Sequence, residues 1–566
     1  MTKSASLLSL SPELIFQIID HTNCPSTILP LALTCSALYS QCQPVLEQHR
    51  EAYNKYKITS DLSPETVPHL LRDGPTAEIE QWHVRELEIW GSRESWRDWR
   101  PWAPELPGAY GLAEEAPSRS SLSTRDVQRL TRKGIELWDF FDFEISDAQE
   151  NLQSGSDAYL KLLLVASCPR LHSIRFVNRP DDLWTSLFWI ERTIQRSRSL
   201  GGTWSPGFQS IQNMAVGVSV GLSPDEEEQE VVHGSILATL LHLPHLKNLH
   251  ICGVFQSQES EEEDEDFEFH EVYEFPISTS SVECLFLDSP SDLSLEFYDA
   301  LASAPKDLDT LVIRARSSTT RPLEDIDTLV TALSFESPQL KRLIAYNGTG
   351  IHGNGVSSHL PTNFRAFEAM THFSIAATDI EEEGYGITGN PAVENLQDEE
   401  RQQAFPPYME AIYVWGHTTF QDYEIDACEN LDFLLARLIE SGDYKDLKVI
   451  YVEHVERMHG NKINEAFAVE TGQLAFPKTL AAGRDAGVHV YTLMNREDGG
   501  YWKSFPARPD RFDLKTGPCG ERPADWRLNL YTGEWGPDCK GCGDCDKCLA
   551  VYPSEMWEKM KNGVAA

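Results

Sequence analysis

The sequence is poor in positive charge. Its 48 lysine and arginine residues face 88 aspartate and glutamate residues, which leaves a formal net charge of −40 at pH 7. A field of that sign repels phosphate backbones and anionic lipid headgroups, so we expect neither general nucleic-acid binding nor docking on an anionic membrane. The acids are unevenly placed, with five in residues 225–230 and nine in residues 259–271. These two stretches predict solvated loops.

The sequence also lacks any run approaching the roughly 18 apolar residues of a membrane span. Near the N-terminus, Glu13, Gln17 and Asp20 interrupt any signal-peptide core. The 12 cysteines are therefore expected to be reduced thiols or metal ligands in the cytoplasm or the nucleus. Apolar residues at 41% and aromatic residues at 10% nevertheless predict a well-packed globular protein.

Residues 10–50 show the pattern of short and strongly apolar helices. Ser11 suits the N-cap and Pro12 suits the first helical position. Apolar residues then recur at helical spacing over 14–19, and residues 29–40 carry too many of them for one narrow face. A segment of this size cannot bury so much apolar surface alone. It must pack on the rest of the chain or on a partner.

Two short motifs in this segment resemble an F-box. The opening motif of that family, L-P-P-E-L with a following isoleucine, is matched by Leu10, Pro12, Glu13, Leu14 and Ile18, with Ser11 at the remaining place. The motif L-T-C-x-x-L-Y, common in fungal members, is matched by Leu33, Thr34, Cys35, Leu38 and Tyr39. The stretch that follows also resembles the region after the box in fungal F-box proteins, so the specific resemblance covers about residues 1–100.

The middle of the chain repeats a six-residue pattern, apolar-x-x-apolar-x-apolar. It occurs at 84–89, 171–176, 246–251, 282–287, 308–313, 340–345, 370–375, 409–414 and 447–452. From residue 246 onward the repeats are 36, 26, 32, 30, 39 and 38 residues apart, often with a helix-like run between them. A strand and a helix at a near-constant period predict an α/β fold, a degenerate leucine-rich-repeat-like solenoid. Its strands are expected to line an extended concave surface suited to a protein partner.

The resemblance implies a substrate-recognition subunit of an SCF-type cullin-RING ubiquitin ligase. The box would bind a Skp-type adaptor, the repeats would bind a protein client, and the chain would carry out no chemistry and need no cofactor. The implied adaptor-facing residues are Leu10, Pro12, Leu14, Ile15, Ile18, Leu33, Leu38 and Tyr39. The competing hypothesis is a repeat scaffold without a ligase role, in which the N-terminal helices only cap the solenoid.

The predicted organisation has three parts. They are an F-box at 1–50, a solenoid at 51–500 with acidic insertions near 225–230 and 256–271, and a cysteine-containing extension at 501–566.

Two further patterns resemble functional motifs. Ser219 lies in a G-x-S-x-G sequence, but the acidic stretch that follows delays the helix that a nucleophile elbow requires. A hydrolase is therefore a third and weaker hypothesis. Trp96, Trp99 and Trp102 interleave with arginines such as Arg93, which resembles a stacking platform for nucleic acid. Their spacing of three and the nearby acids favour core packing or a partner contact instead.

Four cysteines close together are the remaining candidate for chemistry. Cys539, Cys542, Cys545 and Cys548 are each three residues apart, which matches neither the zinc-ribbon spacing nor the ferredoxin spacing. The neighbouring aspartates also oppose thiolate formation. We therefore predict no metal site: purified protein handled anaerobically should be colourless and carry less than about one metal equivalent. A brown preparation, or one zinc per chain that is lost in Cys542→Ser, would contradict this.

Overall fold

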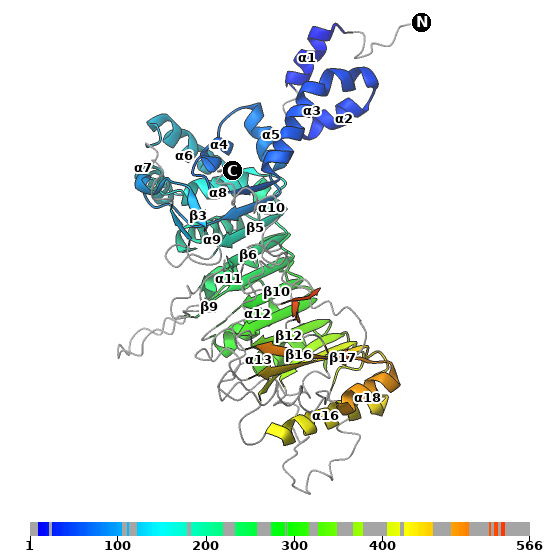
Figure 1. Cartoon of the computed structure of the whole chain (residues 1–566). Coiled ribbons are helices and arrows are strands. Elements are labelled where there is room, and N and C mark those ends of the chain that lie inside the picture. The colour runs from blue at the N-terminus through cyan, green and yellow to red at the C-terminus, as the bar shows by residue number, and fades with distance from the viewer. Residues whose placement is uncertain are drawn as a thin grey trace, which may run out of the picture. The chain divides into compact units, whose positions relative to one another are not determined.

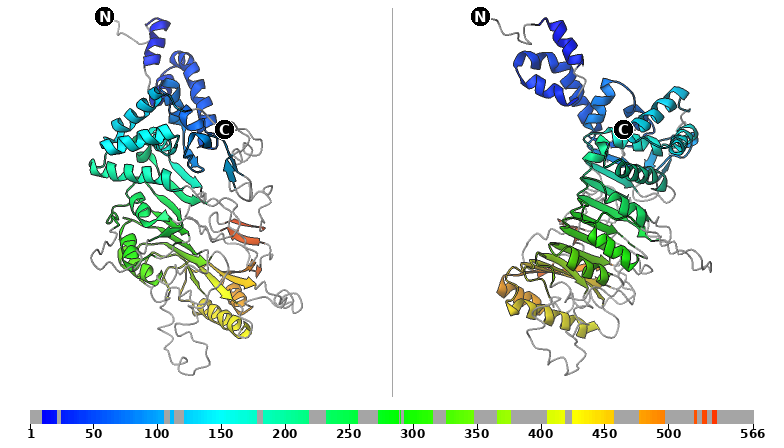
Figure 2. Two further views of the ribbon diagram at one scale, coloured as in Figure 1. Left: turned by 90° about the vertical axis from the view of Figure 1, so that its left-hand side faces the viewer. Right: turned by 180° about the vertical axis from the view of Figure 1, so that it is seen from behind.

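The computed structural model describes residues 10–21, 25–104, 110–112, 121–177, 183–218, 232–256, 273–288, 290, 293–315, 326–347, 366–376, 405–418, 424–456, 477–496, 520–521, 526–529 and 534–537. The chain divides into two compact units. The described part of unit 1 lies within residues 10–212, and that of unit 2 lies within residues 213–537. Figures 1 and 2 show the elements of both.

Unit 1 combines a short parallel sheet with many helices. Strand β1 (Ile58–Ser60) pairs with β2 (Glu86–Ile89), and β2 pairs with β5 (Ser173–Val177). Strands β3 (Trp102–Pro104) and β4 (Tyr110–Leu112) form a separate antiparallel pair. The helices are α1 (Pro12–His21), α2 (Pro25–Leu33), α3 (Ser36–Tyr56), α4 (Thr66–Leu70), α5 (Pro75–His83), η2 (Trp96–Asp98), α6 (Thr124–Trp138), α7 (Asp142–Ser154), α8 (Ala158–Ser167), α9 (Leu183–Ser199) and α10 (Pro206–Ser210).

Helix α8 lies at the centre of unit 1. Apart from Lys161, its sequence AYLKLLLVAS carries no charge and is apolar on most sides, and residues 158–166 are buried. A helix that is apolar all round must be enclosed by other elements. Helices α4, α6, α7, α9 and α10 contact it, so it organises the core of the unit.

Gly134 of α6 shows how closely the helices approach one another there. A β-carbon at this position would overlap the hydroxyl group of Tyr159 on α8 and lie 3.1 Å from its Cζ atom. Gly134→Ala should therefore lower the free energy of unfolding by about 1–3 kcal/mol through overpacking. Among the described residues the Tyr159 hydroxyl has no hydrogen-bond partner, so Tyr159→Phe alone should have little effect.

The double variant Gly134→Ala/Tyr159→Phe should be more stable than the sum of the single changes indicates, because the second change removes the overlapping atom. Urea unfolding of the wild type, both single variants and the double variant measures this coupling. Additive effects would show that the contact does not determine the loss.

Unit 2 is a long parallel sheet. Its strands follow one another in the order β6 (Asn213–Val218), β8 (Asn248–Cys252), β10 (Cys284–Asp288), β11 (Thr310–Ala315), β12 (Arg342–Asn347), β13 (His372–Ala376), β14 (Ala411–Thr418), β15 (Val449–Glu456), β16 (His489–Arg496) and β17 (Gly520–Glu521). Helices α11 (Gly234–Leu240), α12 (Leu295–Ser303) and α13 (Ile326–Glu336) lie on one face of these strands (Figures 1 and 2). Helices α16 (Glu424–Ser441) and α18 (Pro477–Ala486) contact each other.

Two short strand pairs and one isolated bridge complete the description of unit 2. Strands β7 (Val232–His233) and β9 (Val254–Phe255) are parallel, and β18 (Trp526–Asn529) and β19 (Glu534–Pro537) are antiparallel. An isolated parallel bridge joins Ser280 to Pro305.

The strand register of unit 2 confirms the repeat pattern. Each repeat has one buried residue that pairs in register with the corresponding residue of the neighbouring strand. These residues are Leu249, Leu285, Leu311, Leu343, Phe373, Ile412, Ile450 and Val490. All nine predicted segments contain or overlap a strand. The mixed α/β architecture with one long parallel sheet agrees with a solenoid-like fold.

The expected open concave surface is wrong for the described strands. Successive residues of a strand point to opposite faces, so the partners of the buried series should line that surface. Instead they are also buried, at 7% exposed or less: His250, Phe286, Val312, Ile344, Ser374 and Tyr413. Several are apolar, as is typical of parallel strands that are covered on both faces. The apolar positions of the six-residue pattern lie on one face of each strand, so the pattern gave no information about the other face.

The predicted boundaries at residues 50 and 500 do not coincide with the division between the units, which falls at residues 212–213. The three-part organisation remains a prediction. The acidic stretches 225–230 and 257–271 lie outside the described residues, as do Ser219 and the four cysteines from Cys539 to Cys548.

Candidate partner-binding surface on the N-terminal helices

Helices α1, α2 and α3 form the predicted N-terminal helix cluster (Figure 1). Helices α1 and α2 are short, as expected, whereas α3 has 21 residues and continues beyond the predicted segment to Tyr56. Helix α1 begins at Pro12, as expected from the N-cap pattern. Thr34 separates α2 from α3, and its hydroxyl donates to the Leu31 carbonyl at 2.7 Å. This local bond satisfies a carbonyl at the end of α2 and so favours a break at that point.

Each helix uses one apolar stripe for packing against the others. The stripes are pairs four residues apart, as expected for residues on one helical face. They are Ile15 and Ile19, Ile28 and Ala32, and Leu38 and Cys42. All six are at most 4% exposed, so the interior of the cluster is complete without a partner.

A second set of apolar residues on the same helices faces outward. In α1, Leu14 and Ile18 are 47% and 37% exposed; in α2, Leu29 and Leu33 are 54% and 72% exposed. Tyr39 at the start of α3 is 45% exposed. Apolar side chains exposed on three adjacent helices are typical of an interaction site rather than of a solvated surface. The helices therefore carry more apolar surface than their own packing uses.

The structure divides the residues that the F-box resemblance placed on the adaptor-facing surface. Leu10, Pro12, Leu14, Ile18, Leu33 and Tyr39 are exposed. The other two, Ile15 and Leu38, are buried in the helix cluster at 3% and 4% exposed, so their expected place on the surface is wrong. Phe16 and Leu29, at 44% and 54% exposed, were not among the predicted residues. Helical spacing alone could have marked Leu29, because it shares a face with Leu33.

The helix cluster is joined to the rest of unit 1 through α5. His49 of α3 and His83 at the end of α5 are in hydrogen-bond contact, with 2.8 Å between Nδ1 and Nε2. Burial, followed by the charges of His49, Arg85 and Arg170, lowers the pKa of His83 to about 4. The pair is therefore uncharged near pH 7. The two uncharged imidazole rings pack edge to face and so link α3 to α5.

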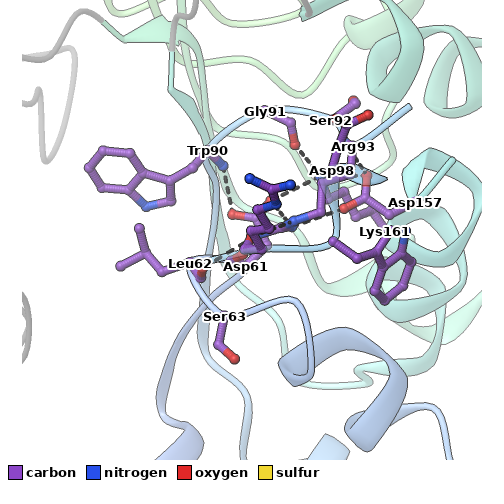
Figure 3. Close-up of polar contacts among 12 residues, drawn as sticks. Asp61, Leu62, Ser63, Trp90, Gly91, Ser92, Arg93, Asp98, Asp157 and Lys161 are labelled. Atoms are coloured by element: carbon purple, nitrogen blue, oxygen red, sulfur yellow. Dashed lines mark hydrogen bonds and ion pairs between the residues drawn. The ribbon is translucent and has the colours of Figure 1, made fainter. Parts of the chain in front are cut away.

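A second cluster of chemically active side chains is fully buried in unit 1 (Figure 3). Asp61 follows β1, Arg93 follows β2, and Asp157 and Lys161 belong to the start of α8; none is more than 2% exposed. The Lys161 ammonium lies 2.9 Å from a carboxylate oxygen of Asp61 and 2.9 Å from one of Asp157. The Arg93 Nη1 atom lies 3.1 Å from the other Asp157 oxygen.

Backbone groups satisfy the remaining polar atoms of this buried cluster. The Trp90 amide donates to Asp61 at 2.8 Å, and Lys161 donates to the Gly91 carbonyl. Arg93 donates to the carbonyls of Asp61 and Arg100 at 2.9 and 3.1 Å. Burial alone would lower the pKa of Lys161, but the carboxylates of Asp157 and Asp61 outweigh it and raise the pKa. Two positive and two negative charges thus neutralise each other and clamp two loops to α8.

In the described ranges, no three histidine, cysteine, aspartate or glutamate side chains are placed to hold a metal ion together. Over the same residues, no helix combines the length and the apolar character needed to cross a membrane.

Comparisons with known proteins identify no family. No family model matches the chain, and no curated protein matches it. Among solved structures it is similar to the crystal structure of the Rad7 and Elc1 complex in yeast, with 11% sequence identity and a TM-score of 0.28. That match covers 81% of this chain and 97% of the other. A likeness at this level does not establish a shared fold.

Proposed function

We propose that this chain is a substrate-recognition subunit of an SCF-type cullin-RING ubiquitin ligase. In this proposal α1, α2 and α3 form an F-box that binds a Skp-type adaptor, and the repeats bind a protein client. The ubiquitin transfer belongs to other subunits, so the chain is not an enzyme. It would act in the cytoplasm or the nucleus.

One observation carries the proposal: each N-terminal helix buries one apolar stripe and exposes further apolar residues. Leu33 is 72% exposed and Leu29 is 54% exposed, although Ala32 and Ile28 beside them are buried. Fully burying a leucine contributes about 1.5–3 kcal/mol, so a partner that covered several of these side chains would be bound tightly. The exposed residues also include six that the F-box resemblance assigns to the adaptor.

The same observation disfavours the alternative, a repeat scaffold in which the helices serve only as a cap. A capping element keeps a polar outer face, because that face remains in water. Here the outward residues of α2 include Leu29 and Leu33 beside Ser26, Thr27 and Pro30, so the outer face is not uniformly polar. The alternative also leaves the exposed Leu14 and Ile18 of α1 without a role.

The buried second face of the sheet restricts where a client could bind. The face that includes His250, Phe286 and Tyr413 is covered within the chain itself. A client is therefore expected on loops, helices or strand ends rather than along the middle of these strands.

Direct reconstitution tests the proposal. Purified full-length chain is mixed with a purified Skp-type adaptor at moderate salt, and the mass of the complex is measured by light scattering after size-exclusion chromatography. We expect a complex with one copy of each protein, and we expect cullin subunits among the proteins that co-purify from cells. Absence of both the complex and the cullin would favour the scaffold alternative.

A further inference from the structure

Three exposed phenylalanines and two arginines of unit 1 form one continuous patch. Phe141 directly precedes α7, Phe143 lies in its first turn, and Phe188 lies on α9; they are 53%, 56% and 47% exposed. The rings of Phe141 and Phe143 are stacked, with 5.7 Å between their centroids. The Arg196 Cζ atom lies 4.0 Å from the ring centroid of Phe141. The Arg192 Cζ atom lies 5.4 Å from that of Phe143 and 4.7 Å from that of Phe188. We call these five residues the phenylalanine–arginine patch.

Hydrogen bonds to the backbone hold the patch in place. Arg196 donates from Nε to the Trp138 carbonyl at 3.2 Å and from Nη2 to the Asp139 carbonyl at 2.5 Å. The Phe141 amide donates to the Glu144 carboxylate at 2.7 Å, which fixes the start of α7. A surface whose side chains are already ordered loses little conformational entropy when a partner binds. The patch is therefore prepared for binding before a partner arrives.

The composition of the patch is that of an interface core. It holds three of the six exposed phenylalanines among the described residues. A single exposed apolar residue is ordinary on a protein surface, but adjoining ones mark interaction sites. Phenylalanine and arginine are also among the residues enriched at protein interfaces. About half of each ring remains in water, so the packing within the chain leaves apolar surface for a partner to cover.

The border of the patch is acidic. Residues 134–150 include six acids and no lysine or arginine. Asp147 pairs with Arg192 at 2.9 Å, and the side chains are 45% and 23% exposed, respectively. Asp139 lies 3.8 Å from Arg196, and the side chains are 83% and 14% exposed. A partner therefore meets rings and carboxylates more readily than guanidinium groups.

This charge distribution favours a basic partner. The carboxylates can pair with lysine or arginine, and the faces of aromatic rings attract cations as well. The net charge of −40 adds a field that draws positively charged molecules toward the chain. The same field repels a second copy of this chain, nucleic acid and anionic lipids. A segment of another protein is the occupant that fits both the apolar surface and the charge.

We propose that the phenylalanine–arginine patch binds a basic segment of a partner protein, in which apolar side chains alternate with lysine or arginine. The apolar side chains would cover the rings of Phe141, Phe143 and Phe188, and the cations would pair with Asp139 and Asp147. The patch is separate from α1, α2 and α3. Its role in binding does not rest on the proposed ligase function.

Peptide selection on the full chain tests the proposal. Random dodecapeptides displayed on phage are selected on the immobilised wild type after depletion on the variant Phe141→Ser/Phe143→Ser. The most enriched peptides are synthesised, and titration calorimetry measures their affinity. Each is compared with a form in which glutamine replaces lysine and arginine, and with a form in which serine replaces the apolar residues.

The matched control variant is Phe335→Ser, which removes another exposed phenylalanine. Phe335 lies on α13 of unit 2 and is 79% exposed. Circular dichroism and thermal melting establish that each variant is folded. If Phe141→Ser/Phe143→Ser does not fold, Phe188→Ser takes its place in the depletion and in the titrations.

We expect the enriched peptides to combine apolar residues with lysine or arginine and to lose affinity in both altered forms. The wild type and Phe335→Ser should bind them equally well. Phe141→Ser/Phe143→Ser should bind them roughly tenfold more weakly or worse, because the apolar contact is lost. The variant Asp139→Asn/Asp147→Asn should also bind them more weakly, and the difference should shrink at high salt because salt screens exposed charges.

Three results would overturn the proposal. One is that no peptide binds in a manner that depends on the phenylalanines of the patch. Another is enrichment of acidic or uncharged peptides. The third is a dimer of the wild type in light scattering that Phe141→Ser/Phe143→Ser lacks, which would identify a second copy as the occupant. Adaptor binding should be unchanged in all variants of the patch, so this proposal and the proposed function fail separately.

Discussion

Asp157→Ala should lower the free energy of unfolding of unit 1 by about 3–5 kcal/mol, because it leaves buried charges without their partner. Arg93 and Lys161 would both lose an ion pair of 3.1 Å or less, and the Arg93 amide would lose its acceptor at 2.9 Å. Asp61 would remain as one carboxylate for two cations. Neither cation can reach water, since each is at most 2% exposed.

The matched control for this variant is Asp147→Ala. Asp147 pairs with Arg192 at 2.9 Å, but its side chain is 45% exposed. A solvent-exposed ion pair contributes about 0–1 kcal/mol, so the same change of residue should have a much smaller effect there. Asp157→Asn should fall between the two, because the amide oxygen can still accept a hydrogen bond from Arg93 while the charge is removed.

Urea unfolding followed by tryptophan fluorescence measures these differences. Nine of the 14 tryptophans lie within residues 1–212, so the signal reports mainly on unit 1. We expect the midpoint to fall for Asp157→Ala with an unchanged slope. Equal midpoints for Asp157→Ala and Asp147→Ala would show that the buried cluster adds no more than a surface pair.

The double variant Leu14→Asp/Ile18→Asp should strongly weaken binding of the Skp-type adaptor while the chain remains folded. The two side chains are 47% and 37% exposed, so aspartates there stay hydrated in the free protein. In the complex they would be buried against apolar groups, which weakens binding by about 3 kcal/mol or more, roughly a hundredfold in Kd. Surface plasmon resonance gives the affinity, and thermal melting gives the stability.

Ile15→Asp is the control for this prediction, since Ile15 lies between the two exposed residues and is buried at 3% exposed. It should disrupt the helix cluster itself, and circular dichroism should record a loss of helix. If Leu14→Asp/Ile18→Asp also melts the cluster, the two residues hold the helices together and the cap alternative is favoured. Unchanged adaptor affinity in the folded double variant would show that Leu14 and Ile18 do not lie in the adaptor interface.

The repeated strands of unit 2 were predictable from sequence because one buried residue recurs in each repeat at a near-constant period. Two strands that the pattern missed, β1 and β16, have polar residues or glycine at its key places. In β1, Thr59 stands opposite Leu87 of β2, and β16 has Gly487 and Thr492 where the pattern requires apolar residues. Strand β6 fits the pattern through Met214 and Val216 and lies outside the nine predicted segments.

The helical character of the N-terminus was likewise predictable, but the assignment of neighbouring residues to the inside or the outside was not. Leu14 and Ile15 are adjacent and similarly apolar, yet the first is 47% and the second 3% exposed. When a helix is apolar on several faces, spacing gives no preference for one of them. The packing of α2 and α3 against α1 decides which face becomes the interior.

The sequence by itself determined the repeating strands, the short apolar helices and the acidic balance, because each is a property of neighbouring residues. Only the tertiary structure decided which charges meet. Asp61, Arg93 and Asp157 are separated by 32 and 64 residues, and their ion pairs depend on the chain bringing two loops to the start of α8. Contacts between distant residues depend on how the elements pack together, and local spacing contains no record of that.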